Sequence, residues 1–147
     1  MTFVMTIIVS TMIERDVIIG LMQSGNMAYD QTNTMLQSYG LTLQQFNVLR
    51  ILRGRNGSAA CLESITNDMI QRMSNTSRLV DRLIVKALVK RKVCEKNRRK
   101  VDIFITNKGL KLLAEIDPIL DAREVEITAS LTLKEKEQLL QLLEKLK

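Results

Sequence analysis

One change in the spacing of apolar residues most constrains the fold of this chain. Along most of the sequence, apolar side chains recur every three or four positions, which is the period of an amphipathic helix. From Val101 to Ile105 every second residue is a β-branched apolar residue instead, as expected of a half-buried strand. The segment Val89 to Val93 supplies a partner strand, and the polar stretch CEKNRRK between them is the expected hairpin tip. We therefore expect one β-hairpin within an otherwise helical protein.

Four helices are expected before the hairpin. The first covers Ile13 to Ser38. A capping box, TLQQ at Thr42 to Gln45, begins the second helix, and GRNG at Gly54 to Gly57 ends it. The segment SAAC is a connector or a short strand. It leads to a short helix from Leu62 to Ile70 and then to a fourth helix from Ser74 to Leu88.

Two helices are expected after the hairpin. Thr106 begins a helix that runs into the 120s and bends at Pro118, and a capping box of Thr132 and Glu135 begins the last, amphipathic helix. Three helices followed by a hairpin form a winged helix-turn-helix, and the helices at both ends are more than that module needs. The expected fold is therefore mainly α with a small β-hairpin, a winged helix-turn-helix domain with flanking helices.

The residue types exclude several classes of function. The chain has no His, so a histidine-built metal site is excluded, and no metal or other cofactor is expected. It has no Gly-rich phosphate loop and no paired carboxylates in an evident cleft, so we expect no enzymatic activity. Two lone cysteines, Cys61 and Cys94, cannot build a disulfide framework and fit a reducing cytoplasm. Cys94 lies between Lys92 and Lys96, whose charge lowers a thiol pKa, so it is the better candidate redox sensor, although a thiol without a regulatory role is the simpler interpretation.

The first residues, MTFVMTIIVSTMI, are apolar but do not predict membrane insertion. They lack the early positive charge of a signal peptide, and they are too short and too interrupted by Thr and Ser to span a bilayer. A flexible tail, an extra strand and part of an oligomer interface all remain open for residues 1–12.

Positive charge is concentrated in one part of the chain. The formal net charge is +6, but Arg72 to Lys111 carries 13 Lys and Arg against three acids, which gives +10. A basic segment within an otherwise acidic chain indicates a polyanionic partner at that place. A solvated basic surface without a partner is the alternative.

The helix that begins SNTSRLVDRL lies within this basic segment. At 100° per residue, one face collects apolar side chains that can pack on the preceding helices: Leu79, Val80, Leu83, Ile84 and Ala87. The opposite face and its edge carry polar and charged side chains: Ser74, Asn75, Arg78, Asp81 and Arg82. Ser, Asn and Arg can meet phosphates and base edges, so this face suits the major groove of DNA. An ordinary solvated helix face is the alternative.

The hairpin adds a second basic group directly after this helix. Its cations crowd one tip: Lys92, Lys96, Arg98, Arg99 and Lys100. Like charges in a cluster repel one another unless solvent or a polyanion compensates them. A basic helix face followed by a basic hairpin predicts two contacts on one duplex, in a groove and on the adjacent backbone.

These segments together resemble the MarR family of bacterial transcription regulators. The likeness rests on SRLVDRL at Ser77 to Leu83, KALVKR at Lys86 to Arg91, NRR at Asn97 to Arg99, and ITNKG at Ile105 to Gly109, in the family's order and spacing. LTLQQFNVLRIL, from Leu41, also resembles the family's second helix. Two positions depart from the pattern. Ala87 replaces the Gly that usually ends the recognition helix. Asn97 replaces the usual Asp of the wing, which is the β-hairpin that follows that helix.

The resemblance implies how the chain is organised and what it binds. A winged helix-turn-helix DNA-binding lobe is expected over residues 42–106, with dimerisation helices over 13–38 and 107–147, in a single domain of residues 1–147. The residues assigned to DNA are Ser74, Asn75, Thr76, Ser77, Arg78, Arg82, Lys92, Asn97, Arg98, Arg99 and Lys100. The residues assigned to the dimer interface are Leu139, Leu140, Leu142, Leu143 and Leu146.

The function that the resemblance implies is sequence-specific transcription regulation in the cytoplasm. We expect a homodimeric repressor on a pseudo-palindromic operator, with half-sites about one helical turn (~34 Å) apart. Release from DNA by a small aromatic ligand, bound between the dimer helices and the DNA-binding lobe, is typical of the family. The alternative is a winged-helix protein-interaction module that does not bind specific DNA.

Overall fold

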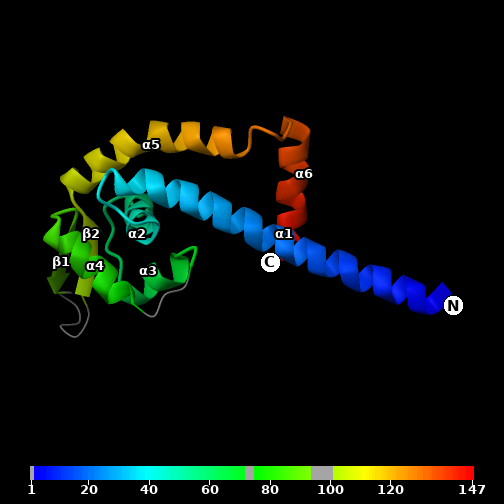
Figure 1. The fold of residues 1–147 in the computed structure, drawn as a ribbon. Coiled ribbons are helices and arrows are strands. Elements are labelled where there is room, and N and C mark those ends of the chain that lie inside the picture. The colour runs from blue at the N-terminus through cyan, green and yellow to red at the C-terminus, as the bar shows by residue number, and fades with distance from the viewer. Residues whose placement is uncertain (1, 72–74, 94–100) are drawn as a thin grey trace.

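The computed structural model describes residues 2–71, 75–93 and 101–147, with side chains from Met12 onward. Its helices and strands follow in the order α1 (Thr2–Gln37), α2 (Leu43–Gly54), α3 (Leu62–Asp68), α4 (Thr76–Val85), β1 (Val89–Val93), β2 (Val101–Ile105), α5 (Asn107–Ile127) and α6 (Leu133–Glu144). This is the predicted winged helix-turn-helix with flanking helices (Figure 1). The predicted residues that lie outside the described ranges are Ser74, Cys94, Lys96, Asn97, Arg98, Arg99 and Lys100.

The lobe of residues 42–106 is built around the predicted hairpin. Strands β1 and β2 pair antiparallel with Val89 opposite Ile105 and Val93 opposite Val101. On the outer edge of β2, Ala60 exchanges two backbone hydrogen bonds with Ile103, so the segment SAAC is a connector with a single bridge to the sheet. Ile103 is fully buried and joins the hairpin to the core of the lobe. That core consists mostly of aliphatic residues from α2, α3, α4 and the hairpin.

The predicted capping signals are confirmed at three helix starts. The hydroxyls of Thr42 and Thr132 accept hydrogen bonds from the backbone of Gln45 and Glu135, whose side chains bond back to the cap residues. Thr106 caps α5 in the simpler form, by accepting from the backbone N–H of Gly109. The backbone N–H and then the hydroxyl of Thr132 hold the pKa of Glu135 below its usual value. Short polar motifs therefore set where α2, α5 and α6 begin.

The end of the recognition helix differs from the prediction. Helix α4 stops at Val85, and Ala87 has a φ of +58°, so it cannot belong to the apolar helix face on which it was placed. Its left-handed backbone is the conformation that Gly adopts most readily, and an alanine there is strained. The turn is nevertheless kept, because the backbone N–H of Leu88 donates to the carbonyl of Leu83 at 3.0 Å.

Gly109 fixes how closely α5 approaches this turn. A Cβ atom at this position would lie 2.5 Å from the Leu88 carbonyl oxygen and 2.8 Å from Cγ1 of Ile105. The carbonyl cannot move freely, since it accepts a 3.0 Å hydrogen bond from the backbone N–H of Thr106. Only a residue without a side chain therefore fits here.

We expect Gly109→Ala to lower the free energy of unfolding by about 1–3 kcal/mol, the usual range for overpacking a filled site. Chemical denaturation monitored by circular dichroism measures this loss. Gly54→Ala is the matched control, because nothing lies within 4 Å of a Cβ at Gly54. Equal stability of the two variants would contradict the close approach at Gly109.

Helix α1 begins much earlier than the sequence predicted. It is continuous from Thr2, so of the three alternatives for residues 1–12 the flexible tail and the extra strand are both excluded for residues 2–12. In Figure 1 the N-terminal half of α1 extends beyond the rest of the molecule. No helix among the described residues has the length and apolar character needed to cross a bilayer.

Helix α5 connects the lobe to α6 and contains Pro118 within its length. The ribbon of α5 is visibly curved in Figure 1. On the lobe side, Leu113 and Ile116 are fully buried, and Arg53 of α2 donates two hydrogen bonds to Asp117, of 2.6 and 3.2 Å. The first half of α5 is thus part of the lobe.

Candidate nucleic-acid interface

Helix α4 separates its side chains between the core and the solvent. Leu79, Val80 and Leu83 are buried against the rest of the lobe, as the helical period predicted. The opposite face is exposed and carries Arg78 and Arg82. An amphipathic helix packed in this way leaves one face available for a partner.

The first turn of α4 presents two small polar side chains. Asn75 is the N-cap residue, but its side chain makes no capping hydrogen bond, and both Asn75 and Ser77 are exposed. Residues of this type commonly cap a helix start with their own side chains. The amide of Asn75 is therefore not committed to capping, and the first turn can present it and the Ser77 hydroxyl to a ligand.

The assignment of Thr76 to DNA does not agree with its position. Its side chain is only 5% exposed, and its hydroxyl accepts a 2.7 Å hydrogen bond from the hydroxyl of Thr66 in α3. Thr76 starts α4 on the side that packs against α3, so its role is to join the two helices of the helix-turn-helix. The prediction took all five residues from Ser74 to Arg78 together, whereas the helical period turns one of them inward.

The first strand of the hairpin carries exposed cations along its described length. Val89 is buried, and Lys90, Arg91 and Lys92 are exposed. The Lys90 ammonium lies 5.9 Å from the centre of the Phe104 ring on the opposite strand. The basic cluster predicted for the tip continues from Lys92 into residues outside the described ranges.

One ion pair connects the hairpin to the recognition helix. Nη2 of Arg91 lies 2.7 Å from Oδ1 of Asp81, and their side chains are 36% and 53% exposed. Neither residue was among the predicted DNA contacts. The sequence does show Asp81 as a single acid on a helix face with two arginines. Its partner, Arg91, lies ten residues further along the chain, and the turn at Ala87 decides where Arg91 is placed.

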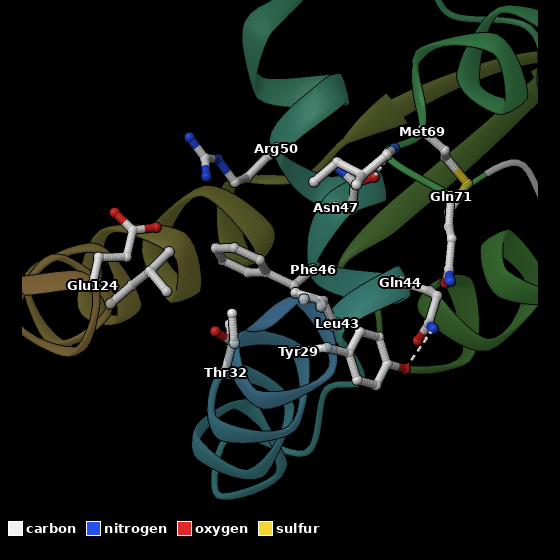
Figure 2. Close-up of a pocket in the computed structure, with 14 residues that line it drawn as sticks. Tyr29, Thr32, Leu43, Gln44, Phe46, Asn47, Arg50, Met69, Gln71 and Glu124 are labelled. Carbon is white, nitrogen blue, oxygen red and sulfur yellow. Dashed lines mark hydrogen bonds between the residues drawn. The ribbon is translucent and has the colours of Figure 1, made fainter. Parts of the chain in front are cut away.

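A cavity of about 360 Å³ lies between α1, α2, α5 and the segment after α3 (Figure 2). Tyr29 and Thr32 of α1 face Leu43 and Phe46 of α2 across it. The wall is mainly apolar, with a few polar groups at its margin, which is the usual character of a small-molecule site. The Tyr29 hydroxyl accepts a 2.8 Å hydrogen bond from the Gln44 amide, which links α1 to α2 beside the cavity.

The same cavity reaches the segment that leads to the recognition helix. Met69, Ile70 and Gln71 contribute to its wall. Asn47 of α2 accepts a 3.0 Å hydrogen bond from the backbone N–H of Ile70 and also lines the cavity. On the opposite side, the Arg50 guanidinium lies 5.9 Å from the centre of the Phe46 ring. A molecule in the cavity would therefore contact α1, α2 and the connection to α4.

Cys61 is the N-cap residue of α3. Its sulfur accepts a 3.4 Å hydrogen bond from the backbone N–H of Ser64, and this N–H is the first cause of a lowered thiol pKa. The residue is partly buried and has no thiol partner among the described residues. Its capping position assigns it a structural role in α3. Cys94, the preferred sensor candidate, lies outside the described ranges.

The comparisons with known proteins concern the fold. No protein-family model matches the chain. A MarR-like transcription regulator from Bacillus cereus superposes with a TM-score of 0.83 at 18% identity, covering 91% of this chain and 95% of that protein. BpsR from Bordetella bronchiseptica, whose DNA binding is regulated by 6-hydroxynicotinic acid, gives 0.80 at 22% identity, with 89% and 98% covered. MepR from S. aureus, solved in complex with DNA, gives 0.74 at 24% identity, with 83% and 89% covered.

The similar structures are transcription regulators. The superpositions on the first two structures cover about nine tenths of each chain, which is far more than the winged helix-turn-helix alone. This chain therefore has the winged-helix fold of the MarR family of transcription regulators, as its motifs predicted.

Proposed function

We propose that this protein is a sequence-specific transcription regulator that binds double-stranded DNA. The observation that carries the proposal is the joint exposure of the first turn and cationic face of α4 and of the cations of β1, within a segment of net charge +10. MepR, with the same fold, has been solved bound to DNA. In such complexes the recognition helix enters the major groove and its N-terminal residues contact base edges.

Assembly into a homodimer is part of this proposal. Leu139, Leu140 and Leu142 of α6 and Leu146 just after it are exposed, and the described part of α1 exposes further apolar side chains: Met12, Ile13, Val17, Ile18 and Ile19. Monomeric soluble proteins rarely expose contiguous apolar surface on this scale, which marks an interaction site. A second copy offers the same apolar faces, and a two-fold pairing of this kind is the commonest form of oligomer. We therefore assign residues 13–38 and 107–147 to dimerisation and residues 42–106 to DNA binding, with the first half of α5 also packed on the lobe.

A two-fold dimer fixes the form of the operator. Two recognition helices would meet half-sites about one helical turn, ~34 Å, apart, so the target is a pseudo-palindrome. Occupation of such a site by the dimer excludes other proteins from it, which supports a repressor.

Ligand control is a further part of the proposal. BpsR is regulated by 6-hydroxynicotinic acid, a small aromatic molecule. The cavity of about 360 Å³ between α1 and the lobe has the size and mainly apolar wall for a ligand of that class. Because its wall includes the segment from Met69 to Gln71, an occupant can bias the position of α4 and so the affinity for DNA.

Selection of bound duplexes from a random pool tests the proposed function directly. The full-length protein is expected to enrich one pseudo-palindromic sequence, and its affinity for that duplex should fall steeply with salt. A winged-helix module that binds only proteins would enrich no sequence and would show no duplex affinity at low salt.

A substitution at Arg98, between the two strands of the hairpin, gives a second test of the proposed function. Arg98, the first arginine of the wing motif, is expected to contact the DNA backbone, and each phosphate contact contributes about one to the slope of log affinity against log salt. Arg98→Ala should therefore weaken all duplexes by a similar factor and flatten that slope by about one, with the melting temperature nearly unchanged. Full retention of affinity and slope would remove Arg98 from the interface, and unfolding would make it a structural residue.

A further inference from the structure

The ion pair between Asp81 and Arg91 joins α4 to β1 beyond the turn that connects these two elements. Asp81 lies on the exposed face of α4, and Arg91 is the middle residue of β1, opposite Ile103. Ile103 is bonded on its other side to Ala60, so the centre of the hairpin has little freedom of its own. The pair therefore ties the middle of the hairpin to the outer face of the recognition helix.

The turn between α4 and β1 is already held by several side chains. The Thr106 hydroxyl donates a 2.8 Å hydrogen bond to the Ala87 carbonyl, and the Lys108 ammonium donates one of 3.0 Å to the Lys86 carbonyl. The Lys86 ammonium in turn donates to the carbonyl of Gly40. These contacts fix the base of the hairpin but lie at one end of it. A contact farther along β1 holds the hairpin to α4 at a second point, and Arg91 makes that contact.

The position of Asp81 is otherwise unfavourable for a DNA-binding surface. Its carboxylate shares an exposed face with Arg78 and Arg82, where a phosphate backbone would repel it. The ion pair with Arg91 compensates that charge. Because the charges of Asp81 and Arg91 neutralise each other, the pair adds no net charge that would attract DNA. Its contribution is therefore to hold the helix and the hairpin in a fixed relative position.

We propose that Asp81 and Arg91 are positioning residues that set the angle of the wing, the hairpin of β1 and β2, to the recognition helix α4. This proposal rests on the proposed DNA binding. The pair lets helix and wing contact one duplex at the same time. It therefore contributes to affinity for the specific site, where both contacts are made together, more than to non-specific binding.

The test compares Asp81→Asn with a matched control in the full-length protein. Asp102→Asn removes the same charge from β2, and Asp102 makes no ion pair with any residue that the structure describes. Affinities are measured for the duplex selected from the random pool and for a scrambled duplex over a range of salt. Circular dichroism melting checks that each variant folds.

Asp81→Asn is expected to weaken binding to the selected duplex about fivefold, the scale of a coupling between contacting residues. Its affinity for the scrambled duplex should stay equal or rise, because a negative charge has been removed. The double variant Asp81→Asn with Arg91→Gln should bind the selected duplex no more weakly than Asp81→Asn, since no ion pair remains to be broken. Asp102→Asn should bind both duplexes at least as tightly as the original protein.

Two results would overturn the positioning role. If Asp81→Asn strengthens binding to both duplexes as Asp102→Asn does, the acid acts only through its charge. If Arg91→Gln weakens both duplexes equally and lowers the salt slope by about one, Arg91 is a phosphate contact instead. Absence of duplex binding by the unsubstituted protein would contradict the proposed function itself, which is a separate outcome.

Discussion

Deletion of the chain from Thr132 onward is expected to give a monomer or insoluble protein. The deleted helix α6 buries none of its residues within one chain, and four of its leucines are exposed, Leu140 to 62%. A helix that contributes no buried residue to its own chain has its apolar surface available for a second copy. Loss of the dimer also removes simultaneous binding to two half-sites, which is worth about 10²- to 10⁴-fold in affinity.

Light scattering measures the loss of the dimer, and duplex binding measures the loss of affinity. A paired substitution, Leu140→Lys with Leu142→Lys, should reproduce the deletion without removing the helix. Gln141→Lys is its control, because Gln141 is an exposed polar residue on the same helix. A well-folded dimer of the truncated chain would contradict the assignment of α6 to dimerisation.

Arg78→Ala is expected to cost about 1–3 kcal/mol on the selected duplex, a loss of roughly 5- to 150-fold in affinity, because Arg78 is expected to read a guanine. The residue is exposed in the first turns of α4, where recognition helices contact base edges. Asn75→Ala should act in the same direction. Binding to the scrambled duplex should fall less in both variants, because base contacts specify the sequence whereas phosphate contacts position the protein.

Lys111→Ala is the control for this substitution, since it removes one exposed positive charge from α5, outside the recognition helix and hairpin. It should change the affinities for the two duplexes by similar small factors. Equal losses on selected and scrambled DNA in Arg78→Ala would remove Arg78 from direct base readout.

Features that depend on neighbouring residues in the chain were predicted well. The capping boxes at Thr42 and Thr132 and the two strands of the hairpin follow from local hydrogen bonding and from alternation, and the structure confirms them. The early start of α1 was missed because residues 1–12 are mostly apolar with scattered Thr and Ser, and they show neither a clear helical period nor a capping signal. Such a sequence is compatible with several structures until a partner surface is known.

Features that depend on tertiary contacts were predicted less well. Thr76 was assigned to DNA, but α3 supplies a hydroxyl that turns it inward, and no pattern within α4 shows this. The pair of Asp81 and Arg91 depends on a left-handed alanine between them. Sequence spacing shows which residues share a helix face. It does not show which strand residue the following turn brings against that face.

Pro118 gives α5 a place to hinge. A proline has no backbone N–H, so the carbonyl four residues earlier, at Ala114, loses its helical hydrogen bond. The residue just before the proline, Asp117, is held to α2 by Arg53, so the weakened turn adjoins the point where α5 is fastened to the lobe. Bending of α5 therefore concentrates there. The ten residues from Pro118 to Ile127 rise about 15 Å. In the proposed dimer a small rotation at this turn would change the separation of the two recognition helices, so we expect Pro118 to set how easily the protein adjusts to the spacing of its half-sites.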